Sequence, residues 1–86
     1  MLFEDFIEKN GPCEAGWKLL RGVIRHRHRA KENGSEPDWP DAVTVGDVLR
    51  NGERGIGWLR GVGPMTVHDI RELFARHGII LKRHGE

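Results

Sequence analysis

The apolar residues of this chain recur at helical spacing in several segments that are separated by turn-forming residues. Near the start, Phe3, Phe6 and Ile7 share one face of a short helix expected over residues 2–9. A helix this short must dock on the rest of the chain to be stable. An Asn-Gly-Pro sequence at 10–12 then interrupts the pattern and predicts a break.

A longer helix is expected from about Cys13 to Lys31. Its predicted apolar face consists of four residues at helical spacing: Trp17, Leu20, Val23 and Ile24. Residues 32–42 are rich in turn formers and predict a loop. Trp39 stands within this loop, and we expect its indole to pin the loop to the core.

The second half of the chain begins with a helix start signal. Thr44 is a typical N-cap residue, and Asp47, three positions later, completes a variant of the capping box. Val43 and Val48 are placed for a hydrophobic staple across this cap. The helix is expected to end at Asn51-Gly52, a typical stop signal.

Two further helices are expected after this stop. A weak one contains Ile56, Trp58 and Leu59, and a stronger one begins at Pro64 after a tight turn at 61–63. The stronger helix has apolar residues at helical spacing: Val67, Ile70, Leu73 and Phe74. Gly78 is expected to terminate it. The apolar tail that follows, Ile79, Ile80 and Leu81, is expected to fold back on the core. The pattern predicts one all-α domain over residues 1–86, a compact bundle of four or five short helices.

The charged residues are unevenly distributed along the chain. The net charge is only +1 with 31% charged residues, which does not by itself indicate a nucleic-acid-binding protein. Two basic blocks, 21–31 and 54–86, flank an acidic block, 32–53. In the first basic block Arg21, Arg25 and Arg29 lie four apart and form a cationic stripe on the long helix. The stripe is either a phosphate-binding surface or a solvated helix face, and the sequence leaves both interpretations open.

Several classes of function find no support in the residues. His26 and His28 lie two apart on a helix, so they do not share a face and no metal site is expected. Cys13 is the only cysteine, which predicts a buried thiol, no internal disulfide and a reducing, cytoplasmic environment. No acid–base pair, nucleophile or cofactor motif stands out, so we expect neither an enzyme nor a bound cofactor. No apolar run is long enough to cross a membrane.

The segment Leu59–Ile70, LRGVGPMTVHDI, resembles the helix-hairpin-helix motif. Gly61 and Gly63 leave the main chain bare, so that a phosphate can approach the backbone N–H groups. The helix that starts at Pro64 would direct its unpaired N–H groups and its positive dipole end at the same place. In that family two short helices joined by a glycine-bearing hairpin grip the nucleic-acid backbone, and such contacts do not read bases.

A wider resemblance covers residues from Val43 to about Lys82, which are similar to the C-terminal domain of the bacterial RNA polymerase alpha subunit. The matching positions are the helix start Thr44-Val45-Gly46-Asp47-Val48, the hairpin glycine Gly63, the following Thr66, Val67, Asp69 and Ile70, and the end Gly78-Ile79-Ile80-Leu81. Members of that family bind the minor groove of A/T-rich DNA and contact transcription factors. The resemblance divides the domain into an N-terminal elaboration, 1–42, and a helix-hairpin-helix core, 43–82.

The resemblance implies DNA contacts by the backbone around Gly63 and by the Thr66 hydroxyl. The expected backbone grip comprises Gly61, Gly63, Met65 and Thr66, and the expected phosphate charge comes from Arg60, Arg71, Arg21, Arg25 and Arg29. The family usually has a basic residue where this chain has Met65, and the arginine and asparagine of its first helix have no clear counterpart before residue 43. The arginine stripe replaces this missing charge only if it faces the hairpin.

The expected function is therefore non-catalytic binding of double-stranded DNA in transcription regulation. The alternative is a protein-interaction module, or a mimic of the polymerase domain that binds a transcription-related protein partner. A near-neutral net charge, Met65 and the acidic loop around Trp39 favour this alternative. The other aromatic side chains, Trp17, Trp58, Phe3, Phe6 and Phe74, are expected in the core rather than stacked on bases.

Overall fold

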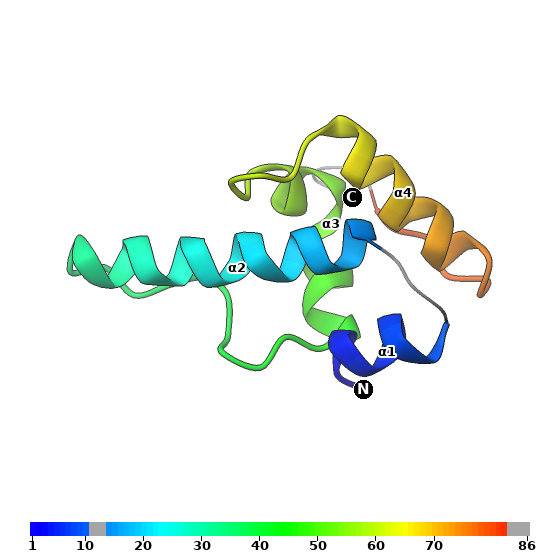
Figure 1. Cartoon of the computed structure of the whole chain (residues 1–86), viewed down its shortest axis with the longest axis horizontal. Helices are drawn as coiled ribbons and strands as arrows, with labels where there is room; N and C mark the ends of the chain where they lie inside the picture. The colour runs from blue at the N-terminus through cyan, green and yellow to red at the C-terminus, as the bar shows by residue number, and fades with distance from the viewer. Residues whose placement is uncertain (11–13, 83–86) are drawn as a thin grey trace.

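The computed structural model describes residues 1–10 and 14–82 and confirms the all-α fold. Its four helices are α1 (Phe3–Lys9), α2 (Glu14–Glu32), α3 (Val45–Gly57) and α4 (Pro64–Ala75) (Figure 1). The predicted break at Gly11-Pro12 and the predicted helix start at Cys13 lie outside the described residues.

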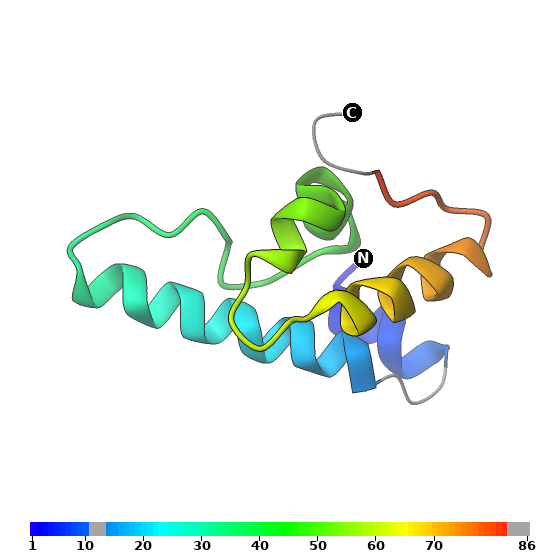
Figure 2. The same ribbon diagram turned by 90° about the horizontal axis from the view of Figure 1, so that it is seen from above.

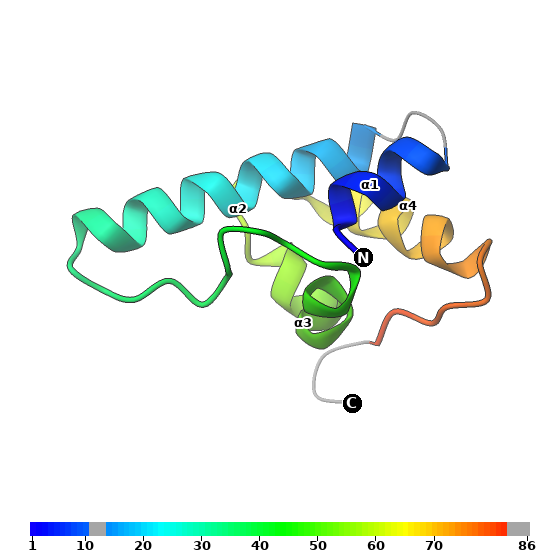
Figure 3. The same cartoon turned by 90° about the horizontal axis from the view of Figure 1, so that it is seen from below.

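The long helix α2 organises the molecule. It runs along the longest dimension, with α1, α4 and α3 gathered around its N-terminal half and middle, and its interface with α4 is the largest between any two helices (Figure 1). The segment that joins α3 to α4 passes across the middle of α2 (Figure 2). Residues 33–43 double back beside the C-terminal half of α2 to reach α3 (Figure 3). The last turns of α2 therefore project beyond the other helices.

One hydrophobic core joins both halves of the chain. The rings of Phe3 and Phe6, on α1, lie 6.0 Å and 5.4 Å from the ring of Phe74, on α4, measured between centroids. Six fully buried aliphatic side chains come from the four helices: Ile7, Leu19, Val23, Val48, Ile56 and Ile70. Full burial of such a side chain contributes about 1.5–3 kcal/mol. The N-terminal helices are thus part of the core that supports residues 43–82.

The predicted apolar face of α2 is wrong in part. Val23 is buried, but Ile24 is 66% exposed, and Trp17 and Leu20 are only partly buried. The apolar side chains that α2 buries completely are Leu19 and Val23, and Leu19 was not part of the predicted face. Helical periodicity identified an apolar side of α2 but placed its centre one residue away from the true one.

Two glycines explain which face of α2 is buried. A Cβ on Gly16 would lie 2.5 Å from the side chain of Ile7, on α1. A Cβ on Gly22 would lie 3.1 Å from the carbonyl oxygen of Arg60, in the segment between α3 and α4. Real Cβ atoms do not fit at the first distance and are crowded at the second, so the bare main chain at these positions lets both partners pack closely against α2.

The predicted start of α3 is confirmed. The Thr44 hydroxyl accepts a hydrogen bond from the Asp47 N–H at 3.1 Å, and the Asp47 carboxylate accepts one from the Thr44 N–H at 2.9 Å. These reciprocal bonds form the capping box. Val43 and Val48, the predicted staple, are both buried.

The predicted stop at Gly52 is a non-helical kink, which divides α3 into two helical parts. Gly52 has φ +69°, a left-handed conformation, and the chain resumes helical geometry as far as Gly57. The two short helices predicted around residue 52 are therefore the two halves of α3. At the kink, the Glu53 N–H donates to the Lys82 carbonyl at 2.8 Å, which fixes the C-terminal tail against α3.

The end of α4 and the acidic loop follow the predictions closely. Gly78 has φ +71°, and the N–H groups of Gly78 and Ile79 close the helix in a Schellman pattern at 3.0 Å each. The tail folds back and buries Leu81, although Ile80 stays exposed. Trp39 is 3% exposed and pins the loop as expected.

Candidate nucleic-acid interface

The hairpin between α3 and α4 is anchored by two buried side chains and exposes the residues between them. Leu59 and Val62 are buried, and the Val62 N–H donates to the Leu59 carbonyl at 3.1 Å. Arg60 and Gly61 form the exposed corner. Gly61 has φ +86°, a conformation that glycine adopts without strain, and this lets the chain turn here. The sequence thus produces a bare, exposed bend at the position predicted for the grip.

The first turn of α4 presents unpaired backbone donors next to this bend. Gly63 is the N-cap, Pro64 occupies the first helical position without an N–H, and the Val67 N–H makes the first helical bond, to the Gly63 carbonyl at 3.0 Å. The amides of Met65 and Thr66 precede that bond, so the helix offers them no carbonyl acceptor. No acidic residue occupies this turn. The positive end of the helix dipole can therefore act on an approaching anion.

The arginine stripe of α2 reaches the hairpin at one residue. The position that a Cβ would take on Gly61 lies 3.1 Å from Nη1 of Arg25. The Arg25 guanidinium therefore lies directly beside the bare main chain of the bend. Gly22, one turn earlier on α2, makes this possible because it packs against the carbonyl of Arg60. The arginine stripe was expected to replace the basic residue absent at Met65 only if it faces the hairpin. Arg25 is the residue of the stripe that meets this condition.

An open groove of about 810 Å³ continues from this contact along the exposed side of α2. We call it the basic groove, and it is lined by Arg25, His26, His28, Arg29, Glu32, Asn33, Trp58 and Arg60. It brings three predicted site residues together: Arg25, Arg29 and Arg60. Its one carboxylate, Glu32, lies 3.1 Å from the imidazole of His28. Positive charge therefore prevails along this groove.

Three predicted site residues lie elsewhere or are constrained. Arg21 is exposed but does not line the basic groove. Arg71 lines a separate hollow beside Gly63 and Pro64, where its Nη1 lies 3.4 Å from Oε1 of Glu53, so part of its charge is already compensated. Thr66 is 8% exposed, which limits the contribution of its hydroxyl. Met65, in contrast, is 72% exposed beside the bend.

The prediction that Trp58 lies in the core is wrong. Its indole is 76% exposed and lines the basic groove, whereas its neighbour Leu59 is buried. Adjacent residues on a helix point in different directions, so Leu59 can face the core while Trp58 faces solvent, and the apolar pattern alone does not tell which of the two is buried. The basic groove therefore contains an aromatic surface that the sequence pattern assigned to the interior.

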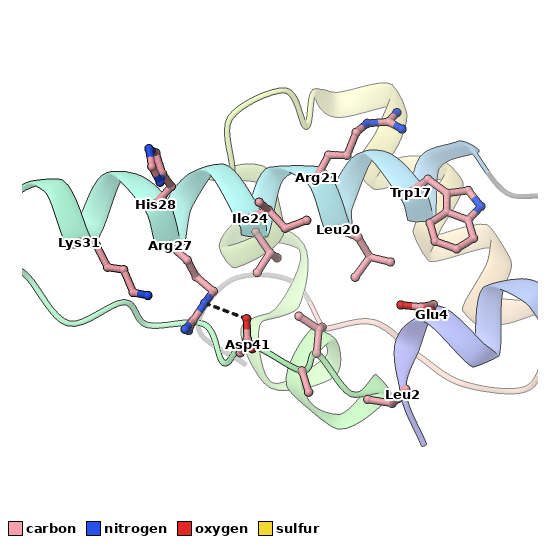
Figure 4. Close-up of a pocket in the computed structure, with 13 residues that line it drawn as sticks. Leu2, Glu4, Trp17, Leu20, Arg21, Ile24, Arg27, His28, Lys31 and Asp41 are labelled. Atoms are coloured by element: carbon pink, nitrogen blue, oxygen red, sulfur yellow. Dashed lines mark ion pairs between the residues drawn. The ribbon is translucent and has the colours of Figure 1, made fainter.

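A second groove lies on another side of α2. It encloses about 570 Å³ between α2, the start of α1 and residues 41–43, and its apolar lining includes Leu2, Leu20 and Ile24. Leu20 and Arg27 point from α2 toward Leu2 and Asp41, whereas Arg21 points away (Figure 4). Arg27 lies 3.9 Å from Asp41 across this groove. We call this surface the apolar groove.

No protein-family model, curated protein or solved structure matches this chain. Among residues 1–10 and 14–82, no three His, Cys, Asp or Glu side chains gather as metal ligands would. In the same residues, no helix has the length and apolar character needed to cross a bilayer.

Proposed function

We propose that this chain binds the sugar–phosphate backbone of double-stranded DNA through the hairpin and Arg25, without catalysing a reaction. The observation that carries the proposal is the position of the Arg25 guanidinium beside Gly61. The guanidinium supplies a full positive charge, Gly61 supplies bare main chain, and the first turn of α4, which follows the bend, supplies backbone amides. Backbone amides, a helix N-terminus and arginine are the groups that proteins commonly use to hold phosphates.

The similarity of residues 43–82 to the polymerase alpha C-terminal domain supports DNA as the ligand and transcription regulation as the setting. In this chain the charge comes from α2, in the N-terminal elaboration, where Arg25 and Arg29 lie in one groove with Arg60. The departure at Met65 is thereby offset by arginines from a different helix. Contacts of this kind position a protein on DNA without selecting a sequence.

A titration of a short DNA duplex at several salt concentrations tests the proposal. Binding to phosphates releases counterions, so affinity should fall linearly on a log–log plot as salt rises. Arg25→Ala should weaken binding and reduce that slope by about 1, the effect of one lost phosphate contact. The matched control is Arg76→Ala, which removes the same charge at the opposite end of α4 and should leave the slope unchanged. Equal affinities and slopes for the two variants would exclude Arg25 from the interface.

A second variant tests the main-chain grip directly. Gly63 has φ −94°, and no atom lies within 4 Å of the position a Cβ would take, so Gly63→Glu is compatible with the fold. Its carboxylate would face the incoming phosphate and should abolish duplex binding at moderate salt. Duplex binding that survives this change would remove the hairpin from the site.

The second candidate function is binding of a transcription-related protein, and the apolar groove is the observation in its favour. Ile24 is 66% and Leu2 is 40% exposed in this groove, and exposed apolar patches often mark protein contacts. If this is the main function, the salt titration should show no duplex binding, and Ile24→Glu should disrupt the protein complex. The DNA proposal ranks first because the hairpin and Arg25 combine two kinds of anion-binding group.

A further inference from the structure

The exposed indole of Trp58 adds a second recognition element beside the hairpin. Its large apolar side chain is 76% exposed at the point where α3 ends. Burial of such a ring in the core would stabilise the fold, so an indole left in solvent is unusual. Aromatic side chains that are exposed on a concave surface commonly serve as contact points for a ligand.

The surroundings of Trp58 indicate the chemistry of that ligand. The basic groove places the indole in the same hollow as Arg25, Arg29 and Arg60. A ligand that fits must offer a flat π surface for the indole together with negative charges for the guanidinium groups. A nucleotide has both, because its base has a π-face and its flanking phosphates are anionic. The groove, about 810 Å³, is within the range of about 300–1,000 Å³ that is typical of small-ligand sites.

Arg25 connects this groove with the hairpin. Its guanidinium lies against Gly61 and also lines the basic groove together with Trp58, so Arg25 joins the bend and the indole on one surface. A fully paired duplex keeps both faces of each interior base covered by its neighbours. An indole can stack only on a base whose face is open, as at a strand end or in a single-stranded extension.

We propose that Trp58 stacks on an unpaired nucleobase while Arg25, Arg29 and Arg60 hold the phosphates of the same strand, so that the site prefers a junction between duplex and single strand. The inference depends on the proposed DNA binding and specifies its substrate. The hairpin holds the duplex backbone on one side of Gly61, and the basic groove receives the emerging strand on the other side. The preference comes from base stacking and is independent of sequence.

Three DNA probes that share the same duplex test this inference. The first is fully paired, the second carries a short single-stranded overhang, and the third carries the same overhang without its bases. Phosphates are equal in number in the last two, so their difference in affinity reports base contacts alone. We expect the complete overhang to bind at least about 5-fold more tightly than the abasic one, the lower limit of a stacking contact.

The variants identify Trp58 as the source of this difference. Trp58→Ala should bind the complete and abasic overhangs equally while keeping its affinity for the plain duplex. Ile24→Ala, which removes another exposed apolar side chain from the apolar groove, should retain the full preference. Quenching of tryptophan fluorescence on binding the complete overhang should also be reduced in Trp58→Phe.

The outcomes separate the two proposals. Failure of the wild-type protein to bind any of the three probes would overturn DNA binding and with it the stacking role. Binding of the plain duplex with equal affinity for the two overhangs would overturn the stacking role and retain the backbone grip. A preference that persists in Trp58→Ala would likewise exclude the indole.

Discussion

At the scale of single residues, Gly22 lets α2 pack closely against the hairpin that Arg25 reaches. A Cβ at position 22 would crowd the Arg60 carbonyl and the Leu59 side chain, both at 3.1 Å, so a larger residue would require these neighbours to shift by a few tenths of an ångström. Arg25 follows one turn later, close enough for its guanidinium to lie against Gly61. A residue without a side chain thus places the charge on which the proposed function depends.

Asp47 provides a second residue-scale case, in which a hydrogen bond links stability to pH. The hydrogen bond from the Thr44 N–H lowers the pKa of the Asp47 carboxyl below its ordinary value, while burial partly opposes this shift; the Thr44 hydroxyl and Arg50 lower the pKa further. A lowered folded-state pKa means that the charged form stabilises the fold. This stabilisation is complete above the ordinary pKa of 3.8 and is lost as pH falls through the lower pKa of the folded protein.

Asp47→Asn should therefore reduce stability in a pH-dependent way. At pH 7 the variant should be less stable than the wild type by about 0.3–1 kcal/mol, the usual contribution of an anion near a helix N-terminus. As pH falls from the ordinary pKa through the lower pKa of the folded protein, the two proteins should converge, because the wild-type carboxyl becomes neutral. Urea unfolding followed by circular dichroism across this pH range measures the difference. A difference that stays constant with pH would contradict the role assigned to the charge.

Single residues also mark the limit of what the sequence could predict. Thr44 and Asp47 interact across three positions, so their spacing alone predicted the cap. The exposure of Trp58 depends on how the end of α3 lies beside α2, which is distant in the chain, and helical spacing carries no information about that contact. The sequence consequently predicted the glycine bend of the candidate site, at Gly61 and Gly63, but did not predict the exposed indole of Trp58.

At the scale of elements, the ends of helices were predictable and their buried faces less so. Pro64 and Gly78 act within one helical turn, and the observed bounds of α4 follow from them. The face that α2 buries was set by Gly16 and Gly22, which receive α1 and the hairpin at close range. The helical spacing of apolar side chains does not reveal that a glycine can lie at a buried contact. The prediction therefore favoured the face that contains Ile24.

The kink in α3 allows a test at the same scale. Gly52 and Gly78 both have positive φ, but a Cβ on Gly52 would lie 2.8 Å from the Lys82 carbonyl oxygen, whereas a Cβ on Gly78 would meet open space. Gly78→Ala should cost about 1–2 kcal/mol for the left-handed conformation alone. Gly52→Ala should cost about 1–3 kcal/mol more, because the tail must move. Equal losses in urea unfolding would show that the tail does not depend on the kink.

At the scale of the whole molecule, the core does not follow the division suggested by the family resemblance. Phe74, on α4, packs against Phe3 and Phe6, and α2 forms its largest interface with α4. A backbone hydrogen bond also joins the two parts of the chain, because the Phe3 N–H donates to the Val43 carbonyl at 2.9 Å. Residues 1–42 are thus structural partners of residues 43–82, and they also carry Arg25.

This arrangement predicts that residues 43–86 alone do not fold. Without α1 and α2, Phe74 would lose its contacts with Phe3 and Phe6, and α4 would lose its packing against α2. Each buried apolar side chain is worth about 1.5–3 kcal/mol against a total stability of about 5–15 kcal/mol. The fragment should show weak helical circular dichroism and poorly dispersed amide resonances, whereas the full chain should unfold cooperatively. Addition of a separate peptide of residues 1–42 should restore part of the helical signal, because the missing half of the core would return. A fragment that unfolds cooperatively by itself would instead establish residues 43–82 as an independent domain, and the shared core would then be a docking interface between two units.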